Sequence, residues 1–252
     1  MQSPIIVVFS IVLLLAMPIY IMYRYRACIF NNVLIGLCKT ITALCFSTFF
    51  IYFIFKWDNL IVNYVAIVLF SLVTSVVALR RARLNVVRYF IPVSISILFS
   101  ALLIGSFSLL VVFGRNCLLH KYVVPVDCLL IINMSYVVSK ALYTYYSGLK
   151  YHNQLYNYLL GNGATYAEAL NFFSRRAIER SVSVSIRNIT SSVGIVFVMF
   201  LTMFFCGIQP FMILAYVLVL FAALFSSSVL SVFISLWISK KYAFDRYSRF
   251  RP

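Results

Sequence analysis

The chain has 252 residues, of which 64% are hydrophobic and only 10% are charged. Soluble globular domains carry about a quarter charged residues, so this composition excludes a water-soluble domain and indicates an integral membrane protein. The formal net charge of +16 would suit a nucleic-acid partner, but the charges follow membrane topology along the chain. We therefore expect contact with the lipid bilayer and its anionic headgroups, and no nucleic acid.

Seven apolar stretches are long enough to cross a bilayer as helices, since about 20 residues span about 30 Å of hydrocarbon. They are continuously apolar rather than alternating, which favours helices over a β-barrel. The sequence therefore predicts an all-α, polytopic membrane protein with one transmembrane domain over residues 1–252. The expected spans are residues 5–23, 33–55, 60–79, 90–113, 123–146, 189–206 and 211–238.

The first stretch resembles a signal peptide in position, but no Lys or Arg precedes it and no small-residue cleavage pattern follows, so we expect a span. The basic residues then fix the topology. Sixteen of the 21 lysines and arginines follow spans one, three, five and seven, whereas Lys56, Arg115 and Lys121 fall on the other side. The positive-inside rule predicts an N-terminus outside and a C-terminus in the cytoplasm, in the cell (inner) membrane.

The long loop between spans five and six, residues 147–188, is cytoplasmic in this topology. Gly161 and Gly163 indicate a helix end within it. Thr165 and Glu168 follow with the spacing of a capping box, in which the two side chains bind backbone amides at a helix start. The sequence therefore predicts a cytoplasmic helix that begins near Thr165.

That helix is amphipathic. Ala167, Leu170 and Phe173 recur at intervals of three, while Glu168 and Arg176 lie elsewhere around it. Such a pattern is typical of an interfacial helix resting among lipid headgroups, and equally of a docking surface for a partner protein. The periodicity alone does not choose between them.

Few residues can carry chemistry. The five carboxylates and two histidines do not cluster, and no metalloprotease, serine-hydrolase or phosphate-cradling motif occurs. We therefore expect no enzyme activity and no cofactor bound by this chain itself, with the identity of any metal ligand unknown.

Polar residues inside the spans are the remaining candidates, because they are costly in a membrane and often functional. Asp127, Asn133 and Lys140 are the candidates for a substrate path, and Asn133 and Lys140 lie on nearly the same face of one helix. The alternatives are snorkelling for Asp127 and polar contacts between packed helices for the other two. The sequence also leaves open whether Cys117 and Cys206 pair.

Several short motifs occur in a recognisable order along the chain. They are Gly163-Ala164-Thr165, Val193-Gly194, Gly207-Ile208-Gln209-Pro210, the spacing of Pro125 and Asn133, and the basic residue Lys39. With these motifs the chain resembles the Fet-type permease family over nearly its whole length. These proteins are membrane subunits of ATP-binding-cassette transporters linked to iron export, related to plant aluminium-tolerance permeases.

The resemblance implies a permease subunit that forms a homodimer and binds a separate cytoplasmic ATPase, which would carry the ATP and Mg²⁺. It also implies export of a metal ion (iron) or another small solute. The residues expected to couple the ATPase are Thr165, Glu168, Leu170, Phe173 and Arg176.

The chain departs from the family at Cys128 and Ile132, where glycines are usual, and at Ala43, where glutamine is usual. The substrate therefore does not follow from the resemblance. Two other functions stay open: a membrane scaffold or accessory protein, and an ATP-independent channel or carrier. A stoichiometric ATPase that copurifies would distinguish the permease from both.

Overall fold

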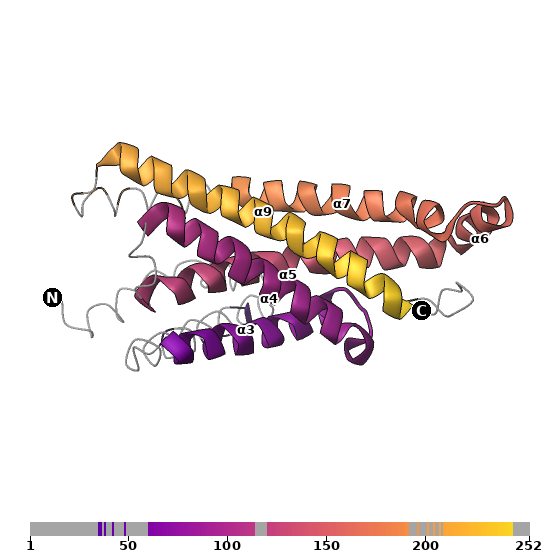
Figure 1. Cartoon of the computed structure of the whole chain (residues 1–252), viewed down its shortest axis with the longest axis horizontal. Coiled ribbons are helices and arrows are strands. Elements are labelled where there is room, and N and C mark those ends of the chain that lie inside the picture. The colour runs from indigo at the N-terminus through magenta and orange to yellow at the C-terminus, as the bar shows by residue number, and fades with distance from the viewer. Residues whose placement is uncertain are drawn as a thin grey trace, which may run out of the picture. The chain divides into compact units, whose positions relative to one another are not determined.

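The computed structural model describes residues 60–113, 120–191 and 209–243, together with the isolated positions 35, 36, 38, 42, 48, 196, 201, 204 and 207. The chain divides into two compact units, Met1–Trp57 and Asp58–Pro252. All helices with described bounds belong to the second unit (Figure 1). They are α3 (Leu60–Arg81), α4 (Val86–Phe113), α5 (His120–Tyr151), α6 (Asn153–Gly161), α7 (Tyr166–Ser191) and α9 (Pro210–Ala243).

Four of these helices are long and apolar enough to cross a membrane: Ile61–Arg81, Val86–Val112, Val123–Tyr151 and Pro210–Lys240. They correspond to the predicted spans at 60–79, 90–113, 123–146 and 211–238, so the all-helical class is confirmed for the described residues. The predicted spans at 5–23, 33–55 and 189–206 lie wholly or mainly outside the described residues, as do Lys39, Cys117 and Cys206. The seven-span topology and the single domain stay predictions.

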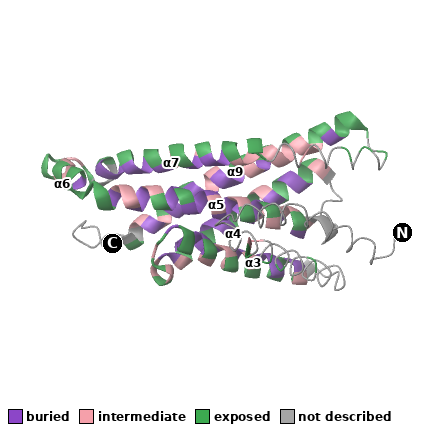
Figure 2. Cartoon of the chain, turned by 180° about the vertical axis from the view of Figure 1, so that it is seen from behind, coloured by how far each residue is buried: buried purple, intermediate pink, exposed green. Residues whose placement is uncertain are grey.

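Helix α5 is the centre of the second unit. It packs against α3, α4, α7 and α9, and Figure 2 shows it buried along much of its length. Its inward residues are large and apolar, including Leu130, Met134 and Leu142. The outer faces of α4 and α9 instead expose Phe107, Phe233 and similar side chains, which suits a lipid surround rather than water.

Serines recur at intervals of four residues along the buried face of α9. Ser227, Ser231, Ser235 and Ser239 are all fully buried. Each hydroxyl donates to a carbonyl of its own helix, as Ser231 does to Ser228 O at 2.9 Å and Ser235 to Val232 O at 2.9 Å. Small residues with satisfied hydroxyls let helices approach closely in a membrane, so α9 packs tightly against α4 and α5.

The basic helix ends gather at one end of the unit. Figure 1 places the end of α3, the start of α4, the end of α5 and the end of α9 together there. Arg80 and Arg81 lie in the last turn of α3, and Lys150 lies in the last turn of α5. This segregation is what the topological prediction requires. Which side this end faces stays a prediction.

Helix α7 differs from expectation in length and direction. It runs for 26 residues without a break, through the predicted loop and into the start of the predicted span at 189–206. It packs against α5 and α9 instead of lying across the ends of the spans (Figures 1 and 2). Its apolar side is therefore used inside the chain, and the interpretation of α7 as a free interfacial helix is wrong.

Candidate functional site

Helices α6 and α7 form a hairpin at the basic end of the unit, defined here as residues 153–174. Its turn is a Schellman motif: Ala164 N donates to Leu159 O at 3.1 Å and Gly163 N donates to Leu160 O at 3.1 Å. Gly163 has φ +85°, a conformation in which a Cβ would be strained. The predicted stop after Gly161 is confirmed, with Gly163 as the residue that reverses the chain.

The capping box at the start of α7 is also confirmed. Thr165 N donates to Glu168 Oε2 at 2.8 Å, and Glu168 N donates to Thr165 Oγ1 at 3.4 Å. The hydrogen bonds from the Thr165 backbone and side chain lower the pKa of Glu168. At pH values above the ordinary pKa of Glu168, the ionised carboxylate therefore stabilises the start of α7. This stabilisation is lost as the pH falls through the lowered pKa.

Thr165→Ala is expected to weaken the helix start by about 1 kcal/mol, since the amide of Glu168 loses its acceptor. Amide exchange in the first turn of α7 should become about fivefold faster in hydrogen-exchange mass spectrometry of the purified chain. Thr165→Ser keeps the hydroxyl and is the matched control. Equal exchange in the two variants would show that the threonine side chain does not hold the helix start.

The apolar side of α7 is interior. Leu170 is fully buried and Phe173 is 2% exposed. The ring of Phe173 lies over Gly148 of α5, where its Cδ1 atom is 3.4 Å from the position that a Cβ would take. The interpretation of Leu170 and Phe173 as a surface for a partner is therefore wrong: both side chains join α7 to α5.

The opposite side of α7 is exposed and carries the charges. The Nε atom of Arg175 is 2.9 Å from Glu179 Oε1, an exposed pair four residues apart along the helix. Phe172 is 50% exposed and packs edge-on against its buried neighbour Phe173, with ring centroids 5.5 Å apart. The guanidinium of Arg176 lies 5.9 Å from the Phe172 ring centroid. A partner of α7 would meet this side.

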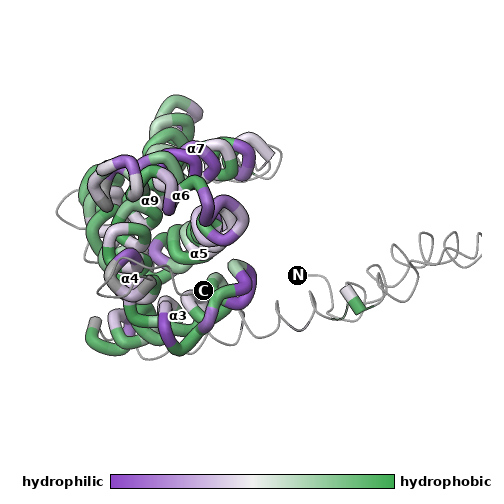
Figure 3. Tube along the Cα trace, turned by 90° about the vertical axis from the view of Figure 1, so that its right-hand side faces the viewer, coloured by the Kyte–Doolittle hydropathy of each residue, from purple (hydrophilic) through white to green (hydrophobic). Residues whose placement is uncertain are grey.

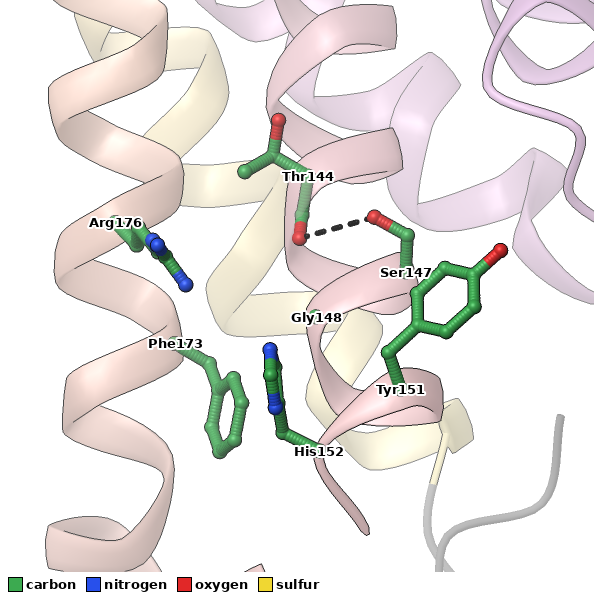
Figure 4. Close-up of a pocket in the computed structure, with 7 residues that line it drawn as sticks. All are labelled: Thr144, Ser147, Gly148, Tyr151, His152, Phe173 and Arg176. Carbon is green, nitrogen blue, oxygen red and sulfur yellow. Dashed lines mark hydrogen bonds between the residues drawn. The ribbon is translucent and has the colours of Figure 1, made fainter. Parts of the chain in front are cut away.

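Figure 4 shows a cavity of about 210 Å³ between the end of α5 and α7. Phe173 and Arg176 project into it from α7, and the His152 ring stands beside Phe173. The rest of its lining comes from α5: Thr144, Ser147, Gly148 and Tyr151. Sequence reasoning missed His152, because a lone histidine between two helices has no pattern that marks it.

A second cavity, of about 540 Å³, continues along the same two helices and shares Thr144 and Arg176 with the first. We call it the basic groove, because Lys140, Arg176 and Arg180 line it. The Nζ atom of Lys140 is 5.9 Å from the ring centroid of Tyr136. The structure thus brings Lys140, predicted for the path, together with Arg176, predicted for coupling.

A polar tie joins three helices deeper in the unit. Asn133 of α5 donates through Nδ2 to Leu224 O of α9 at 3.2 Å, and Asn188 of α7 donates to Asn133 Oδ1 at 3.4 Å. The hydroxyl oxygens of Ser185 and Ser228 are 2.8 Å apart nearby along α7 and α9. Asn133 therefore acts as a contact between packed helices, the structural alternative that the sequence left open.

Asp127 lies apart from the basic groove and from the polar tie at Asn133. It is buried, and its carboxylate packs so closely on Gly105 of α4 that a methyl group on that glycine would overlap Oδ1. Among the described residues, Oδ1 has no hydrogen-bond partner. Asp127, Asn133 and Lys140 do not together line either of these two cavities. The described residues contain no group of three His, Cys, Asp or Glu side chains able to hold a metal ion.

Comparison with known proteins identifies a family but no individual relative. No curated protein and no solved structure matches the chain. The model of the uncharacterised protein family UPF0014 matches residues 5–244, which is almost the whole chain. The chain therefore belongs to the UPF0014 family.

Proposed function

We propose that this chain is the permease subunit of an ATP-binding-cassette transporter, working with a separate cytoplasmic ATPase. Its membership of the UPF0014 family and its four described apolar helices support a membrane protein. The resemblance of its motifs to the Fet-type permeases supports the transporter assignment. The observation that carries the proposal is the α6–α7 hairpin, a structured element that projects from the basic end of the unit and packs against α5 through Phe173.

The hairpin would reach beyond a hydrocarbon layer that begins at Val123. A count of about 20 residues from Val123 brings α5 to Tyr143 at about 1.5 Å per residue, which fills about 30 Å of hydrocarbon. Tyr151 lies about 12 Å farther along the same helix, and α6 extends past it in Figure 1. Seen from that end in Figure 3, hydrophilic stretches of α5, α6 and α7 lie close together. An element of this reach is accessible to a soluble partner.

The hairpin also offers aromatic anchors. Tyr158 of α6 and Phe172 of α7 are exposed, although this part of the chain projects towards water. Exposed aromatic side chains are enriched where proteins bind one another, and they often supply much of the binding energy. These two residues replace Leu170 and Phe173 as the proposed contacts, with the capped turn at Thr165 and Glu168 holding the hairpin in shape.

A push on the hairpin would reach the membrane through α7. The buried contact between Phe173 and Gly148 couples the helix to α5, and the polar tie at Asn133 couples it to α9. Closure of the ATPase on ATP would then favour one arrangement of these helices over another, which is what transport coupling requires. A homodimer, outward transport and a metal-ion substrate such as iron complete the proposal, on the strength of the resemblance.

The test is copurification with the ATP-binding-cassette ATPase encoded nearest this chain. Tyr158→Ser combined with Phe172→Ser should weaken ATPase association at least about 30-fold and abolish stimulation of its hydrolysis, since one such anchor contributes about 2 kcal/mol. Val87→Ser is the matched control, because Val87 is 88% exposed at the same end of the unit but lies on α4. Thermal unfolding should be unchanged in all variants.

Other outcomes would replace the proposal. Unaltered association of the double variant would exclude the hairpin as the docking site. A chain that recruits no ATPase and changes no hydrolysis rate would be a scaffold or accessory protein. Solute flux in liposomes that contain this chain alone would identify a channel or carrier.

A further inference from the structure

We propose that the basic groove between α5 and α7 binds the phosphate group of an anionic lipid headgroup. The groove adjoins the surface assigned to the ATPase, because Arg176 lies 5.9 Å from the Phe172 ring centroid, but the proposal does not depend on that assignment. Lys140 enters it from α5, and Arg176 and Arg180 enter it from α7. Four observations support the proposal: unbalanced charge, donor chemistry, volume and depth in the membrane.

The positive charge of the groove is not balanced within the described part of the chain. Glu179 is the only carboxylate among its lining residues, and its Oε1 is 2.9 Å from Nε of Arg175, which lies outside the lining. Glu168 caps the start of α7, and Asp127 lies about 20 Å away along α5. Three cations therefore share one carboxylate that another arginine already engages, and an anion would relieve their mutual repulsion.

The donors suit a phosphate. Arg176 and Arg180 present planar guanidinium groups that bind phosphate oxygens in pairs, and Lys140 adds an ammonium point charge. Tyr143 and Ser183, which both carry hydroxyl groups, line the same space. A groove of about 540 Å³ is far larger than an inorganic ion and has the size of a typical small-ligand site.

The depth of the groove favours a lipid as the source of the phosphate. A hydrocarbon layer of about 30 Å that begins at Val123 would end near Tyr143, where headgroups would begin at the basic end. Basic pockets between transmembrane helices at this level are suited to anionic headgroups, and tyrosine is enriched there. Along α5, Leu129, Ile132 and Tyr136 continue the helical face of Lys140 into the hydrocarbon, and Leu129 and Ile132 are exposed. That strip would accommodate an acyl chain.

The experiment measures lipid binding to the purified full chain by native mass spectrometry and by thermal unfolding in neutral detergent. The probes are dioleoyl-phosphatidylglycerol, dioleoyl-phosphatidylcholine as the neutral lipid, and glycerol 3-phosphate as the soluble phosphate. Phosphatidylglycerol should bind and raise the melting temperature, whereas the other two should not. Combining Lys140→Gln, Arg176→Gln and Arg180→Gln should lower the affinity for phosphatidylglycerol about 100-fold, at about fivefold for each basic residue.

The matched control combines Arg80→Gln, Arg81→Gln and Arg83→Gln, which removes the same charge from exposed positions at the same end of the unit. This variant should bind phosphatidylglycerol within about threefold of the original chain. Equal losses in the two triple variants, or no preference for the anionic lipid in the original chain, would overturn the proposal. Equal binding of glycerol 3-phosphate would overturn the lipid assignment in favour of a soluble phosphate ester. If the groove triple variant does not fold, Arg180→Gln against Arg81→Gln gives the same comparison with single changes.

Discussion

Phe173→Ala is expected to lower the free energy of unfolding by about 3–5 kcal/mol, the usual loss when a buried phenylalanine ring is removed. The ring is 2% exposed and fills the space over Gly148, so its removal leaves a cavity between α5 and α7. The melting temperature of the purified chain should fall, and protease cleavage within residues 153–174 should accelerate. Phe173→Asp should be more severe, since it also buries an unpaired charge.

The control for this prediction is the preceding residue in the chain. Phe172→Ala removes the same side chain from a position that is 50% exposed, and we expect a loss below about 1 kcal/mol. Comparing variants of the two adjacent phenylalanines should therefore distinguish a role in folding from a role in docking. We expect Phe173 variants to lose stability and Phe172 variants to keep it. Similar melting temperatures for Phe173→Ala and Phe172→Ala would mean that α7 is not packed on α5 in the membrane.

Gly105→Ala is the second substitution with a large expected effect. A methyl group at Gly105 would overlap the Asp127 carboxylate, so α4 and α5 must move apart or the aspartate must leave its site. Overpacking of this kind costs about 1–3 kcal/mol, and we expect a lower melting temperature and a lower yield of folded protein.

A second change tests whether Asp127 is the cause. Asp127→Ala removes the overlapping carboxylate, so the double variant Gly105→Ala with Asp127→Ala should be more stable than Gly105→Ala alone. Gly161→Ala is a control in open space, because no atom beyond its chain neighbours and its own helix backbone lies within 4 Å of the position that its Cβ would take. A double variant no more stable than Gly105→Ala would show that the aspartate does not occupy this position.

Local patterns in the sequence predicted local structure well. The four described spans follow from apolar length alone, because a hydrocarbon interior leaves a backbone few alternatives to a helix. The capping box and the helix end at the glycines could also be predicted from the sequence. Both are short-range hydrogen-bond motifs whose residues lie within a few positions of one another. Thr165, Glu168 and Gly163 consequently have the roles that their spacing indicated.

Contacts between residues far apart along the chain could not be predicted from such local patterns. The spacing of Leu170 and Phe173 identified an apolar side of α7, but periodicity does not say whether that side meets lipid, another protein or a helix of the same chain. The answer depended on Gly148, whose missing side chain leaves room for the Phe173 ring. Likewise, Asn133 could be recognised as unusual within a span, whereas its bonds to Leu224 O and Asn188 required the packed structure.

The position of the polar tie along α7 has a mechanical consequence. Asn188 lies about 35 Å from Thr165, at about 1.5 Å per residue. Phe173 holds α7 on α5 between these two points, so the helix has no free arm that could pivot. A displacement at the hairpin would therefore be carried over this distance by α7 and α5 moving together as a packed pair, and it would meet α9 at the polar tie.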